Sequence, residues 1–196
     1  TLGTLAQTSN PDNKVAIVSA GAIEPLVALV RGGSAAAQEH AVSLLSNLAT
    51  TADSQVAIAQ AGAIEPLVAL MRGGSSVARG QAAWALGNLA GMNTNNQVAI
   101  AQAGAIDPLV ALVRSGSAEA QEKAAWTLGN LAHTSVENQV AIVSAGAIEP
   151  LVALVRSGSA EAQEKAAWAL ECLAVHADNQ VAIAQAGAIE PLVALV

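Results

Sequence analysis

The tryptophans of this chain recur at one position, and two of the three are followed four residues later by asparagine. The pairs are Trp84 with Asn88, Trp126 with Asn130, and Trp168 with Cys172 in place of asparagine. An asparagine amide offers both a donor and an acceptor, as an extended peptide backbone requires. A tryptophan ring packs on aliphatic stems and attracts cations. The pattern therefore predicts a surface that binds an extended chain.

Helical periodicity places both members of a pair on one face. At about 100° per residue, Leu86 and Leu89 fall on one side of a helix. Gln81, Trp84 and Asn88 fall on the opposite side. The position of Gln81 is occupied by Lys123 and Lys165 in the two later copies. In the earliest copy, the three positions are occupied by His40, Ser43 and Asn47. A second interpretation needs no ligand, because Trp and Asn can simply pack between successive helices. We favour binding, since a tryptophan opposite the apolar stripe is more than a core residue.

The sequence contains no motif for catalysis or for cofactor binding. It has no G-x-G-x-x-G, no H-E-x-x-H, no phosphate loop and no pair of cysteines. Cys172 and His176 are four residues apart and can face each other on a helix, but a Cys–His nucleophile or metal site needs further partners. We therefore expect no enzyme activity, no cofactor and no metal.

The Trp/Asn pairs recur because the chain is built from successive repeats of about 42 residues each. The phrase AGAI-x-PLVAL occurs five times, and its glycines are Gly21, Gly62, Gly104, Gly146 and Gly187. Each copy predicts three helices, as at 96–103, 106–114 and 117–132, the first of them capped by Asn or Asp. Gly104 is expected at the left-handed end of the first helix, and Ser117 as the N-cap of the third. The second helix is apolar nearly all round, including Leu29 in the first copy, and must be buried.

Composition excludes several classes of partner. Apolar residues make up 53% of the chain and aromatic residues 2%, which suits small, closely packed helices. The net charge of −7 argues against nucleic acid, which favours a basic face. No apolar run is long enough to span a membrane. A single cysteine excludes an intrachain disulfide and is compatible with the cytoplasm or nucleus for a natural protein.

The three-helix unit, the AGAI-x-PLV start of the second helix and the WALGNLA end of the third (84–90) resemble the armadillo family. HEAT repeats, the runner-up, lack the short first helix and this Gly-Ala-Ile-x-Pro phrase. The resemblance implies an all-α fold, a right-handed α-solenoid of armadillo repeats. In armadillo proteins such as importin-alpha, the third helices line a concave groove that holds an extended peptide.

Carried over by position, the resemblance implies a set of groove residues from the third helices. These are Asn47, Gln81, Trp84, Asn88, Lys123, Trp126, Asn130, Lys165 and Trp168. Importin-alpha-like sequences often carry an acid one turn before the tryptophan, where this chain has Gln81, Lys123 and Lys165. This departure argues against a basic import peptide and makes a neutral or acidic segment, as in the beta-catenin branch, at least as well supported. Glu122 and Glu164 can neutralise the lysines along the same helix.

The repeat pattern predicts a single domain over residues 1–196. Its parts are a partial third helix at 1–9, full repeats at 10–50, 51–91, 92–133 and 134–175, and a partial repeat at 176–196. Neither end carries a polar cap, which solenoids normally need for solubility. The chain is therefore expected to be a piece of a longer array or to associate head-to-tail with other copies.

Two functions follow from these features. The first is a non-enzymatic scaffold that binds a protein segment or an extended peptide. The second is a structural or engineered repeat scaffold without an evolved ligand. Between 98–131 and 140–173 only six of 34 positions differ, and both recent duplication and deliberate construction produce such similarity.

Overall fold

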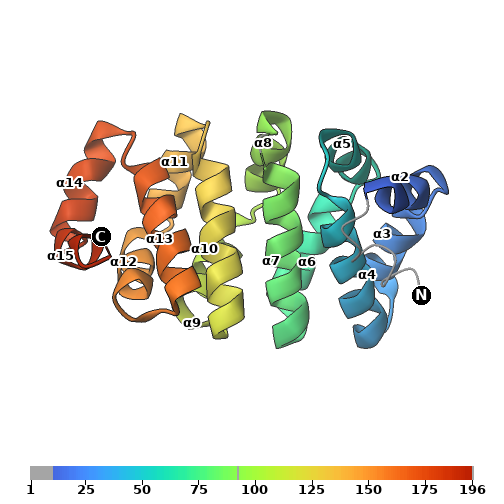
Figure 1. Cartoon of the computed structure of the whole chain (residues 1–196), viewed down its shortest axis with the longest axis horizontal. Helices are drawn as coiled ribbons and strands as arrows, with labels where there is room; N and C mark the ends of the chain where they lie inside the picture. The colour runs from blue at the N-terminus through green and yellow to red at the C-terminus, as the bar shows by residue number, and fades with distance from the viewer. Residues whose placement is uncertain (1–10, 92, 196) are drawn as a thin grey trace.

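The structure, a computed structural model, describes residues 11–91 and 93–195 as helices stacked along one axis (Figure 1). The first helices of the repeats are α2 (Pro11–Ser19), α5 (Ala52–Gln60), α8 (Thr94–Gln102), α11 (Val136–Ser144) and α14 (Ala177–Gln185). The second helices are α3 (Ile23–Gly32), α6 (Ile64–Gly73), α9 (Ile106–Ser115), α12 (Ile148–Ser157) and α15 (Ile189–Val193). The third helices are α4 (Ala35–Leu48), α7 (Ser76–Ala90), α10 (Ala118–Ala132) and α13 (Ala160–Leu173). The predicted α-solenoid is confirmed, while the partial helix predicted at 1–9 lies outside the described residues.

A left-handed glycine separates the first helix of each repeat from the second. Gly104 has φ of 77°, and the Ala105 N–H donates across the turn to Ile100 O at 3.3 Å. Glycine is needed because a β-carbon disfavours positive φ. Helices α8 and α9 consequently meet at 82°. The chain then enters the third helix through Ser117, whose hydroxyl accepts the Ala120 N–H at 3.3 Å, so both predicted caps are confirmed.

The first helices begin earlier than predicted and use other caps. Helix α8 starts at Thr94, and its N-cap is Asn93, whereas Thr51 and Ser135 cap α5 and α11. The expectation of Asn or Asp caps is therefore correct for α8 alone among these three helices. Hydroxyl and amide oxygens serve equally well because both accept an exposed N–H at the helix start.

Buried amides instead cap the carboxyl end of the preceding third helix. Asn138 Nδ2 donates to Leu131 O at 3.0 Å, and Gln139 Nε2 donates to Ala132 O at 2.9 Å. Asn96 and Gln97 make the same bonds to Leu89 O and Ala90 O. The last carbonyls of a helix have no partner within the helix. The first helix of a repeat therefore supplies hydrogen-bond donors to the last carbonyls of the third helix before it.

The second helices α3, α6, α9 and α12 form the interior, apart from one leucine of α3, whereas α15 contains no buried residue. Leu70, Leu112 and Leu154 are buried, but the equivalent Leu29 is 43% exposed, so its predicted burial was wrong. Leu70 lies in a hollow formed with Val30 of the preceding repeat. Leu29 belongs to the first repeat that the structure describes, so it has no described equivalent of the Val30 contact made by Leu70.

Among the described residues, no single helix is long and apolar enough to span a membrane. Four successive pairs of first and second helices reach the required length and hydropathy only together, and they bend by 76° to 82°.

The amide caps predict a specific loss of stability. Asn138→Ala leaves the Leu131 carbonyl without its partner and should lower the free energy of unfolding by about 1–3 kcal/mol. Asn95→Ala is the matched control, because Asn95 lies exposed in the first turn of α8. Urea unfolding followed by circular dichroism measures both. Equal midpoints for the two variants would contradict this role of Asn138.

Candidate functional site

The predicted binding residues lie on the third helices, which stand side by side on one face of the molecule (Figure 1). Helix α7 packs on α4, α10 on α7, and α13 on α10. Because the repeats are in register, equivalent side chains form rows across this face, which we call the third-helix face. All nine predicted residues are half-buried there, neither in the core nor fully in solvent.

Each of the two later tryptophans covers a glycine of the preceding third helix. A β-carbon on Gly87 would overlap ring atoms of Trp126, and one on Gly129 would overlap the ring of Trp168. The rings of Trp84 and Trp126 also contact each other, with centroids 4.5 Å apart and planes tilted by 33°. Packing between third helices therefore buries part of the surface of each ring. The exposed part remains available to a ligand.

The glycines under the rings were not identified from the sequence. Gly87 follows Trp84 by three residues in the WALGNLA phrase, but the ring that covers it belongs to Trp126, 39 residues later. A glycine inside a predicted helix could have indicated this contact, because glycine is unfavourable there and is usually retained where another group packs closely.

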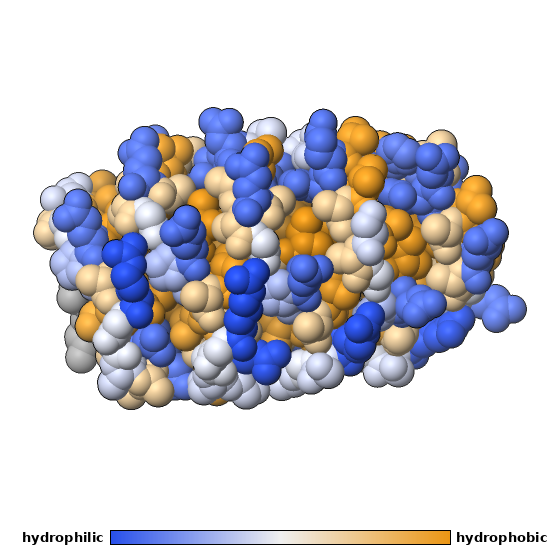
Figure 2. Space-filling model, turned by 180° about the vertical axis from the view of Figure 1, so that it is seen from behind, coloured by the Kyte–Doolittle hydropathy of each residue, from blue (hydrophilic) through white to orange (hydrophobic). Residues whose placement is uncertain are grey.

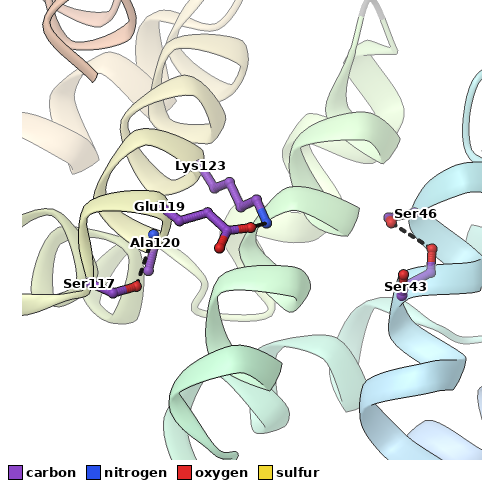
Figure 3. Close-up of polar contacts among 6 residues, drawn as sticks. All are labelled: Ser43, Ser46, Ser117, Glu119, Ala120 and Lys123. Atoms are coloured by element: carbon purple, nitrogen blue, oxygen red, sulfur yellow. Dashed lines mark hydrogen bonds and ion pairs between the residues drawn. The ribbon is translucent and has the colours of Figure 1, made fainter. Parts of the chain in front are cut away.

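The asparagine amides tie adjacent third helices together. Asn88 Nδ2 donates to Ser46 O at 2.9 Å, and Asn130 Nδ2 donates to Gly87 O at 3.2 Å. Each bond uses the nitrogen, which leaves the side-chain oxygen as an acceptor for a ligand N–H. On α4, Ser43 replaces the tryptophan, and Ser46 Oγ donates to Ser43 O at 2.8 Å (Figure 3). The first repeat therefore contributes Asn47 without a ring beside it.

The lysines of the third-helix face are paired with glutamates. Lys123 forms an ion pair with Glu119, one turn earlier on α10 (Figure 3). Lys165 Nζ lies 2.7 Å from Glu164 Oε1 and forms a second ion pair. The predicted partner Glu164 is confirmed, although it is adjacent to Lys165 in sequence. For Lys123 the predicted Glu122 is wrong, and the partner is Glu119, four residues away on the same helix face. Gln81 occupies the equivalent position on α7 without a charge.

The carboxylates are the more exposed members of these pairs. The lysine side chains are 13% and 29% exposed, against 70% and 72% for Glu119 and Glu164. Helices α10 and α13 together carry five glutamates and two lysines. The charge that a ligand meets at this end of the third-helix face is therefore negative.

Cys172 occupies the asparagine position on α13, and its buried thiol is expected to be unreactive. Its Sγ lies 3.8 Å from Nδ1 of His133, which follows α10 directly, so a histidine of the preceding repeat contacts the thiol. Burial, with a smaller contribution from Glu171, raises the pKa of the Cys172 thiol to about 11. A protonated thiol is a poor nucleophile and metal ligand. Within the described ranges, no three His, Cys, Asp or Glu side chains are grouped to hold a metal ion.

The sequence profile of the Armadillo/beta-catenin-like repeat matches residues 10–50, 51–91, 93–133 and 135–174. The chain belongs to the armadillo repeat family. Comparison with curated protein sequences gave no match.

Solved structures similar to this armadillo chain include engineered proteins. One engineered protein from the Northeast Structural Genomics Consortium is 36% identical with a TM-score of 0.92, over 99% of this chain and 79% of that one. A designed armadillo repeat protein in complex with the peptide (KR)4 is 30% identical with a TM-score of 0.89, over 97% of this chain and 80% of that one. Computationally designed armadillo repeat proteins for modular peptide recognition give 29% identity and a TM-score of 0.89, over 97% and 80%.

The contact between ring and glycine predicts a severe effect of a single methyl group. Gly129→Ala places a β-carbon inside the Trp168 ring and should destabilise the armadillo array by about 1–3 kcal/mol. Gly73→Ala is the control, because a β-carbon there meets nothing within 4 Å. Denaturant midpoints measure both. A neutral Gly129→Ala would show that the ring does not seat on this glycine.

The raised pKa of Cys172 predicts slow alkylation. At pH 8 the thiol is protonated and buried, so iodoacetamide should modify the folded chain far more slowly than the urea-unfolded chain. The rate for the folded chain should rise as the pH approaches 11. Rapid alkylation of the folded chain at pH 8 would show that the thiol is accessible and ionised.

Proposed function

We propose that this armadillo chain is a non-enzymatic scaffold that binds an extended, Lys/Arg-rich peptide along the third-helix face. The observation that carries the proposal is the row of half-buried Trp84, Trp126 and Trp168 rings, flanked by exposed carboxylates. Aromatic faces beside carboxylates attract the cationic heads and pack on the aliphatic stems of lysine and arginine.

The spacing of the rows supports an extended ligand. Neighbouring packed helices lie about 8–10 Å apart, and an extended chain advances about 3.3 Å per residue. Successive third helices therefore meet a ligand every two or three residues. Asn88 and Asn130 use their Nδ2 groups to bond the preceding helix, and their side-chain oxygens can accept backbone N–H groups at that interval.

The negative charge at the α10 and α13 end of the third-helix face favours a basic ligand over the neutral or acidic alternative that the sequence left open. That expectation depended on Lys123 and Lys165, and both are paired with glutamates that are more exposed. A similar designed armadillo repeat protein was solved with the peptide (KR)4, which supports the same ligand class.

A binding measurement tests the proposal. A fluorescent Lys-Arg octapeptide should bind the chain in fluorescence polarisation, and an Asp-Glu octapeptide should not. The double variant Glu119→Gln with Glu164→Gln should weaken binding by about tenfold, because each exposed ion pair contributes up to about 1 kcal/mol. Glu65→Gln is the control, since this exposed glutamate lies at the start of α6, outside the third helices.

The outcomes separate the parts of the proposal. Preference for the acidic peptide would reject the charge argument and retain the binding face. Failure of both octapeptides and of a broad peptide array would favour a scaffold without a ligand. Equal weakening by Glu65→Gln would show that net charge alone drives binding.

A further inference from the structure

The first turns of the third helices differ between the two halves of the third-helix face. One repeat position is occupied by Ala36 in α4, Val77 in α7, Glu119 in α10 and Glu161 in α13. All four residues are exposed, Val77 to 59% and the Glu119 side chain to 70%. At this position the α4 and α7 half is therefore uncharged, and the α10 and α13 half has a carboxylate on each helix.

This first-turn position lies on the same side of the helix as the tryptophan row. Val77 precedes Gln81 by four residues and Trp84 by seven, so the three side chains follow one another along one face. In α10, Lys123 occupies the position of Gln81, and its ion pair with Glu119 places that carboxylate beside the same row (Figure 3). A ligand that lies on the tryptophans therefore also meets the first-turn position.

The other carboxylates of the third helices are divided in the same way. Glu39 is the one acid of α4, and its Oε1 accepts the hydroxyl of Ser75, whereas α7 contains no acid. Helices α10 and α13 contain Glu122, Glu164 and Glu171 in addition to their first-turn glutamates. The carboxylates of the third-helix face are therefore concentrated on α10 and α13.

The second helices show no such division. Each has one acid in its first turn, and these are Glu24, Glu65, Asp107, Glu149 and Glu190. Figure 2 shows the side of the molecule opposite the third-helix face, where hydrophilic and hydrophobic residues are mixed along the whole length. The asymmetry of charge is therefore a property of the third helices and not of the repeat as a whole.

We propose that the ligand of the third-helix face is an extended segment in two parts. Its Lys/Arg residues lie over α10 and α13, and uncharged, partly aliphatic residues lie over α4 and α7. This assignment rests on the proposed function, namely a peptide along the tryptophan row. Eight extended residues span about 26 Å, which matches the three intervals between four helices packed about 8–10 Å apart. Each half of such a segment covers two helices.

The two halves of the face favour different side chains. Over α10 and α13, cationic heads meet glutamates beside the Trp126 and Trp168 rings. Over α7, Val77 and Trp84 provide apolar surface without a carboxylate. A lysine or arginine there loses hydration without gaining an ion pair. An aliphatic side chain at the same place is favoured, because the contact removes apolar surface from water.

A charge placed at Val77 tests the division of the face. Val77→Glu extends the row of first-turn carboxylates onto α7, where the helix dipole favours an anion. Val56→Glu is the matched control, because it adds the same charge at a 41% exposed valine of α5, outside the third helices. Circular dichroism checks that both variants fold.

Three fluorescent octapeptides are compared by fluorescence polarisation at about 0.15 M salt, which screens distant charges. One is the Lys-Arg octapeptide. The other two join a basic half, Lys-Arg-Lys-Arg, to an uncharged half, Val-Ser-Val-Ser, in the two possible orders. In the wild-type chain, one order should bind several-fold more tightly than the other, because only one order places its basic half over α10 and α13.

The variants should then change the ranking of the peptides. Val77→Glu should strengthen binding of the Lys-Arg octapeptide by up to about fivefold, the effect of one exposed ion pair. It should not strengthen binding of the preferred mixed peptide, and Val56→Glu should affect all three peptides equally. Equal binding of the two mixed orders, with the Lys-Arg octapeptide still bound, would overturn the two-part ligand and retain the proposed function. Failure of all three peptides would reject the proposed function itself.

Discussion

The contact between each third helix and the one before it is the interaction on which this armadillo structure depends. The Trp126 and Trp168 rings lie over Gly87 and Gly129, and the Asn88 and Asn130 amides donate to backbone carbonyls of the preceding third helix. Close approach requires the absence of a side chain on the glycine, and the amide bond fixes the register. Because every repeat contacts only its neighbours, this contact sets the spacing of the whole array.

The same side chains that build this contact also form the proposed binding face. A ligand meets only what the packing leaves free, namely the exposed part of each ring and the oxygen of each amide. The substitutions on α13 change this balance. Glu171 stands where Gly129 stood one repeat earlier, so no ring can seat there in the same way, and Cys172 replaces the asparagine. Trp168, besides covering Gly129, also lines an apolar hollow at the C-terminal end of the described array.

Local signals were enough to predict the fold, and long-range contacts were needed for the site. The period of Gly104 and its equivalents, together with Ser117, specifies where helices begin and end, because these residues act on their own backbone. Burial of Leu29 was predicted wrongly because it depends on a preceding repeat. The partner of Lys123 was missed because it depends on which glutamate shares its face. The role of Gly87 was not visible from the sequence, since its ring comes from the next repeat.

Rings that are already packed on glycines still form the proposed ligand-binding surface. The chain has three tryptophans, so its ¹⁵N-labelled indole N–H groups give three signals that report on the third-helix face alone. Titration with a Lys-Arg octapeptide should move all three signals saturably and with one affinity. Unchanged indole signals, while other resonances of the chain shift, would show that the peptide binds elsewhere and that the tryptophan row only holds the repeats together.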